Sequence, residues 1–77
     1  MIVGDVPVLK PRDVVRLLDC LGFTLVRQRG SHRQYRHADG RRTTLAFHGR
    51  RDISPILLRL IARDVDRTLD ELLTACV

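Results

Sequence analysis

Gly30-Ser31-His32 is the segment whose residue types are best suited to chemistry, because it places a histidine after a turn-forming glycine within an arginine-rich stretch. Histidine titrates near neutral pH, so it can take up and release protons under physiological conditions. Arginine binds phosphate oxygens through planar, bidentate hydrogen bonds. A histidine among arginines is therefore typical of a surface that binds a polyanion and performs proton transfer on it.

The positive charge is concentrated in one part of the sequence. Residues 27–51 contain eight arginines and one acid and carry about +7, whereas the remainder carries about −2 of the total of +5. A solubilising surface is the simpler interpretation, but an eight-to-one imbalance favours a binding surface. The candidate nucleic-acid-binding residues are Arg27, Arg29, Ser31, Arg33, Arg36, Arg42, Arg50 and Arg51.

The elements that must position these residues follow from hydrophobic periodicity and turn signals. The apolar spacing predicts a helix over 11–21 and another over 55–64, with Ser54 as its N-cap. A capping box of Thr68 and Glu71 predicts a short last helix. Alternating residues predict strands at 23–28, 31–37 and 42–48.

This order of elements predicts an α+β fold in which two helices cover the apolar face of a three-stranded antiparallel sheet. The sheet residues expected to meet the helices are Phe23, Leu25, Tyr35, Leu45 and Phe47. The helix residues expected to be buried include Leu57, Leu60, Ile61, Leu69, Leu72, Leu73 and Cys76. Two cysteines make no disulfide framework, so Cys76 is interpreted as a core residue and Cys20 as a neutral filler.

Face parity restricts where the histidines lie. A three-residue loop at 38–40 would place His32 opposite Ala46 and diagonal to His48, whereas a loop centred on Gly40 would place the two histidines directly opposite. In both cases His32 and His48 share the exposed face, and His37 lies on the other one.

His32 has three interpretations on the residues alone. It is a solvated strand histidine, a general acid–base beside a phosphate backbone, or a metal ligand. His32 and His37 point to opposite faces and no carboxylate cluster completes a coordination shell, so we expect no metal and no other cofactor.

The length of 77 residues predicts a single domain over 1–77, with one modest core and a shallow, open active site. No apolar run reaches the length of a membrane span, and nothing resembles a signal peptide. We therefore expect a cytoplasmic protein.

A family resemblance rests on a series of short motifs: Leu21-Gly22-Phe23, Arg27 to Tyr35 with its Gly-Ser-His, His37-x-Asp39-Gly40-Arg41, Phe47-His48, and Ile53-Ser54-Pro55. Over about residues 8–75 the chain resembles the HicA toxins. The resemblance implies a fold like that of a double-stranded-RNA-binding domain and a metal-independent endoribonuclease that cleaves mRNA. It also implies a HicB-type antitoxin as partner and His32 as the catalytic histidine.

The resulting hypothesis is that His32 takes the proton of a ribose 2′-OH, which attacks the adjacent phosphate of single-stranded mRNA. His48 is the candidate that protonates the leaving 5′-oxygen. Two other functions remain open at this point. One is a non-catalytic RNA-binding module, and the other is a protein-interaction subunit whose basic face meets an acidic partner.

Overall fold

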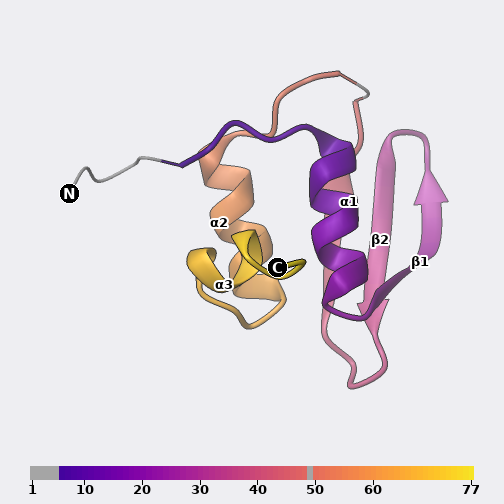
Figure 1. Cartoon of the computed structure of the whole chain (residues 1–77). Coiled ribbons are helices and arrows are strands. Elements are labelled where there is room, and N and C mark those ends of the chain that lie inside the picture. Colours follow the sequence, from indigo (N-terminus) through magenta and orange to yellow (C-terminus); the bar gives the residue numbers. More distant parts are fainter. Residues whose placement is uncertain (1–5, 49) are drawn as a thin grey trace.

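The chain forms one three-stranded antiparallel sheet with three helices, and the computed structural model describes residues 6–48 and 50–77 (Figure 1). The strand order is β1-β2-β3, so β2 is central. The elements are α1 (Pro11–Cys20), β1 (Phe23–Arg29), β2 (His32–His37), β3 (Arg42–Ala46), α2 (Pro55–Asp64) and α3 (Leu69–Leu73). The predicted α+β layout is confirmed. Within the described ranges, no helix is long and apolar enough to cross a membrane.

The starts of α2 and α3 are set by side chains that accept hydrogen bonds from the first turn, whose N–H groups have no partner within the helix. Ser54 Oγ accepts from the backbone N–H of Leu57 at 3.1 Å. Thr68 and Glu71 cap each other reciprocally, at 3.1 and 2.8 Å. The hydrogen bond from the Thr68 backbone N–H lowers the pKa of Glu71 below its usual value. Both helix starts are thus where the sequence predicts them.

The hydrophobic core lies between the helices and one face of the sheet. In this layer α1 packs on β1 and α2 packs on β3, while α3 packs on α2. The fully buried side chains include Val14, Leu18, Phe23, Leu45, Leu58, Ile61, Val65 and Leu72. The helices leave the opposite face of the sheet, called here the exposed face, open to solvent.

Some expected core residues are less buried than predicted. Leu25 is 46% exposed, because β1 is an edge strand and Leu25 lies at the mouth of a hollow between β1 and α1. Phe47 is half-buried against the core. Leu60 is 41% exposed, since α2 turns Leu58 and Ala62 inward instead.

The expectation for the cysteines is wrong. Cys20 and Cys76 form a disulfide with a Cα–Cα distance of 5.4 Å across 56 positions of sequence. Neither is a core residue, because α3 ends at Leu73 and Cys76 lies in the turn that follows it. This turn brings the C-terminal segment back to the end of α1, as Figure 1 shows. Periodicity within a helix carries no information about such a long-range approach.

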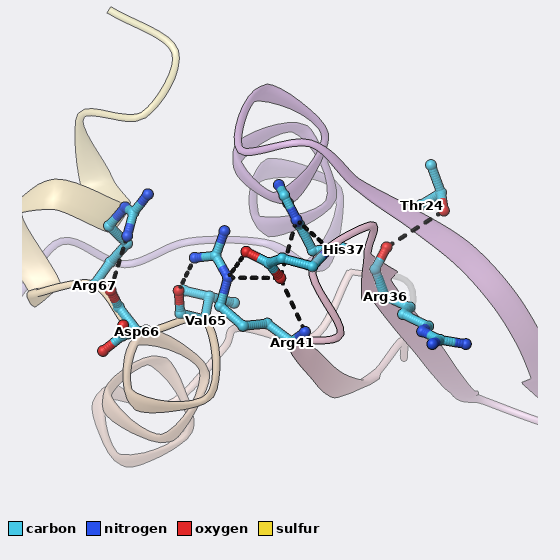
Figure 2. A network of polar contacts seen from close by, with 8 residues as sticks. Thr24, Arg36, His37, Arg41, Val65, Asp66 and Arg67 are labelled. Carbon is cyan, nitrogen blue, oxygen red and sulfur yellow. Dashed lines mark hydrogen bonds and ion pairs between the residues drawn. The ribbon is translucent and has the colours of Figure 1, made fainter.

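A polar network attaches the β2–β3 turn to the end of α2 (Figure 2). Arg41 pairs with Asp39 through its Nε, at 2.8 Å to Oδ2, and its Nη1 donates to the carbonyl of Val65. The backbone N–H and the guanidinium of Arg41 lower the pKa of Asp39 below its usual value. His37 packs edge-on against Phe23, with the ring centroids 5.2 Å apart. Arg41 and His37 therefore contribute to the packing of the domain.

A second polar contact joins the sheet to the same helix. Thr43 is 3% exposed, and its hydroxyl donates to Asp64 Oδ2 at 3.0 Å. This interaction satisfies a buried hydroxyl that would otherwise be costly to desolvate. It fixes β3, and hence the register of the exposed face, relative to α2.

Candidate active site on the exposed face of the sheet

The exposed face is built from alternate residues of β2 and β3. His32, Gln34 and Arg36 of β2 are exposed, whereas Tyr35 is buried on the helix side. His32 lies opposite Ala46, which is the register of the three-residue loop at 38–40. The backbone N–H of His37 donates to the carbonyl of Arg41 at 2.8 Å and closes that loop.

Arg27 and Arg29 reach the same face because β1 contains a bulge at Val26. Leu25 pairs with Tyr35, but Arg27 pairs with Gln34, so one extra residue lies between the two pairs. Strict alternation from Phe23 and Leu25 would have placed both arginines on the helix side. The sequence carries a signal for this bulge, since strict alternation would turn two arginines toward the core and leave Val26 in solvent.

His32 lies in a shallow hollow with the two arginines. Arg29 is its cross-strand partner on β1. The hollow has a volume of about 290 Å³ and is lined by Arg27, Arg29, His32, Gln34 and Thr44. The side chain of His32 is exposed, so its ring nitrogens are accessible to a bound molecule. The arrangement joins a proton-transfer group to two cations with room for a phosphate between them.

His48 lies outside this hollow. β3 ends at Ala46, and the N–H of Phe47 donates to the carbonyl of Ser31 at 2.6 Å, which extends the pairing by one residue. His48 is exposed and lines a separate hollow with Ala46 and Arg51. The two histidines are therefore diagonal neighbours across Ala46, and the structure does not bring them into one hollow.

The remaining predicted site residues divide between the two faces. Arg36 and Arg42 lie opposite each other on the exposed face. Arg33 points to the helix side, where its guanidinium carbon is 3.9 Å from the centroid of the Phe47 ring. Its Nε is buried, with no hydrogen-bond partner in the described part of the chain. Arg33 is thus separated from His32 by the thickness of the sheet.

The other predicted residues border the face. Ser31 is half-buried in the turn that Gly30 begins, and Gly30 has a φ of 58°, in the left-handed region that glycine adopts readily. Arg50 and Arg51 are exposed in the segment that leads to α2. Lys10 Nζ donates to the carbonyl of Arg50 at 2.8 Å and pairs with Asp52, which ties this segment to the start of α1.

Two residues that the sequence analysis did not assign to a site line the hollow of His32. Gln34 and Thr44 are cross-strand partners at its centre. Their exposed positions follow from strand parity, but polar uncharged side chains on a solvated face give no sequence signal of a binding role.

Comparison with known proteins identifies the family. The family model described as the HicA toxin of bacterial toxin–antitoxin systems matches residues 11–66, from the start of α1 to just past α2. No curated protein matches the chain. The matched region contains the whole sheet, the bulge and the hollow around His32, and it covers well over half of the chain. The chain belongs to the HicA family of toxins of bacterial toxin–antitoxin systems.

Proposed function

We propose that this toxin is a metal-independent endoribonuclease that cleaves single-stranded mRNA in the cytoplasm. The observation that carries the proposal is the hollow in which His32 lies beside Arg29 and Arg27 on an open, basic face. An RNA strand can reach such a face without entering a cleft. A HicB-type antitoxin is the partner expected to cover the same surface, as the family membership indicates.

The reaction uses the nucleophile that the substrate contains. His32 in its neutral form accepts the proton of a ribose 2′-OH, and the 2′-oxygen attacks the adjacent phosphorus. The bond from phosphorus to the 5′-oxygen breaks, and that oxygen takes up a proton. The products are a 2′,3′-cyclic phosphate and a 5′-OH end, so atoms and charges balance without an external reagent.

The arginines stabilise the charge that develops on the phosphate. Arg27 and Arg29 line the hollow of His32, so their guanidinium groups can donate to the non-bridging oxygens of a phosphate bound there. His48 is the candidate donor for the leaving 5′-oxygen, from the adjoining hollow across Ala46. Water can replace it there, because the face is open.

The test is cleavage of a single-stranded RNA by the purified chain in the presence of a chelator, with an all-deoxy strand of the same sequence as control. We expect cleavage of the RNA alone, and a loss of at least about 100-fold for His32→Ala, the usual contribution of a general base. His48→Ala should lose less. RNA binding without cleavage by the unmodified chain would establish a binding module instead, and cleavage of DNA would exclude the 2′-OH mechanism.

A further inference from the structure

A second hollow adjoins that of His32 on the exposed face. It has a volume of about 210 Å³, and its exposed lining comes from Val26, Gln34, Arg36, Arg42 and Thr44. Gln34 and Thr44 also line the hollow of His32, so they form the wall between the two. Residues two apart on a strand are separated by about 6.6 Å, which places the second hollow one step further along β2.

The arginines of this hollow are arranged as an anion site would require. Arg36 and Arg42 are direct cross-strand partners, and like charges directly opposite each other destabilise a sheet. In residues 6–48 and 50–77, neither arginine has an ion-pair partner. An anion held between them would relieve this repulsion and engage both guanidinium groups.

The other walls of the hollow suit a nucleobase. Val26 is 56% exposed at the bulge and offers an apolar contact. Gln34 carries an amide that both donates and accepts, and Thr44 carries a hydroxyl, so both can bind the edge of a base. No aromatic side chain lies on this face in the described residues, so the planes of the Arg36 and Arg42 guanidinium groups are the surfaces on which a base can stack.

We propose that this second hollow binds the nucleotide next to the scissile phosphate, and that Gln34 determines which base is preferred there. Arg36 and Arg42 hold the phosphate of that nucleotide, while Gln34 and Thr44 contact its base. The inference rests on the proposed ribonuclease function and adds a specificity site to it.

The test uses DNA oligonucleotides with a single ribonucleotide, so that cleavage occurs at one defined bond. The base on each side of that bond is varied among the four possibilities, and kcat/KM is measured for each. We expect the unmodified chain to discriminate at least fivefold between bases at one of these positions. Gln34→Ala should reduce this discrimination to less than twofold while the poorest substrate is cleaved at an unchanged rate.

Gln28→Ala is the matched control, because Gln28 is a glutamine of the same sheet that pairs with Arg33 and lies on the helix side of the bulged ladder. This variant should keep the full base preference. Arg36→Ala and Arg42→Ala should raise KM for every substrate alike. A base preference that survives Gln34→Ala in full would overturn the specificity site and leave the ribonuclease intact.

Failure of the ribonuclease proposal is distinguished by a binding measurement. Non-cleavable 2′-O-methyl RNA hexamers of differing base sequence replace the substrate, and their affinities are compared for the unmodified chain and Gln34→Ala. Loss of discrimination in affinity, in a chain that cleaves nothing, would support the base-binding hollow without the catalysis. Equal affinities for all hexamers in both proteins would overturn the hollow as a base site.

Discussion

Arg29 is the cross-strand partner of His32 at the closed end of the β1–β2 hairpin, and the bulge at Val26 puts it there. The pairing fixes a permanent cation beside the histidine through backbone hydrogen bonds. A site on two paired strands is positioned more rigidly than one on loops. The geometry of the candidate active site therefore depends on the register of one hairpin.

Replacing both Arg27 and Arg29 by alanine should weaken binding of single-stranded RNA and its salt dependence together. Each lost phosphate contact lowers the slope of log K against log salt by about 0.7, so the double variant should lose about 1.4. The measurement is a salt titration of RNA affinity, using the His32→Ala background to prevent cleavage. An unchanged slope would show that these arginines do not contact phosphate.

Deletion of Val26 should remove the bulge without moving either arginine. The pairs of Arg27 with Gln34 and of Arg29 with His32 lie beyond the extra residue, so a regular ladder keeps both. The salt slope and the thermal melt should stay close to those of the unmodified chain, while the second hollow loses its apolar wall. A slope that falls as far as in the arginine double variant would contradict this register.

Arg33 and Arg36 provide a matched pair of arginines on opposite faces of the same strand. Arg33→Ala removes the contact with Phe47 and should lower the free energy of unfolding by about 1 kcal/mol, the range of a cation–π interaction. Its salt slope should not change. Arg36→Ala should leave stability intact and lower the slope by about 0.7. Denaturant unfolding and RNA titration of both variants would reveal any exchange of these roles.

The charge of Asp39 should stabilise the fold at neutral pH and not in strong acid. Its pKa is lowered from the usual 3.8, chiefly by the hydrogen bond from the Arg41 backbone N–H. Stabilisation from a lowered carboxyl pKa is complete above the unfolded value and is lost as the pH falls through the folded value. Asp39→Asn should thus lower Tm at pH 7, and the difference should vanish toward pH 2. A Tm difference independent of pH would mean that the charge contributes nothing.

Reduction of the disulfide should lower stability and spare catalysis. Loop-closure entropy for a bond across 56 positions corresponds to about 4 kcal/mol at most. The bond joins the end of α1 to the C-terminal segment, on the helix side of the sheet, away from the exposed face. Cys20→Ser should therefore unfold at lower denaturant concentration and cleave RNA at an unchanged rate below its transition. A matching loss of activity would place the bond in the site.

Local signals account for what was predicted. The cap at Ser54 and the box of Thr68 and Glu71 fixed two helix starts, and parity alone placed His32 on the solvent side. The sequence left two registers open for the β2–β3 loop, because Gly40 is compatible with both. The observed φ of 99° at Gly40 and the pairing of His37 with Arg41 select the three-residue loop.

Features that depend on three dimensions could not be predicted in the same way. The stacking of Arg33 on Phe47 joins residues of neighbouring strands, and the sequence shows only another arginine in a basic run. The bond between Cys20 and Cys76 depends on how the last turn meets α1. The bulge at Val26 required the chain to be compared with its partner strand, since a single strand shows only its own alternation.

The same cysteine pair makes most of this toxin a covalent ring, which runs from the end of α1 to the C-terminal turn and contains every strand. A protease that cuts one exposed segment of the ring, such as that around Arg51 before α2, produces a nicked molecule whose two pieces stay attached. The core contacts and the basic face then remain assembled. An oxidised toxin is in this way protected against the first cut of degradation, and a reduced one is not.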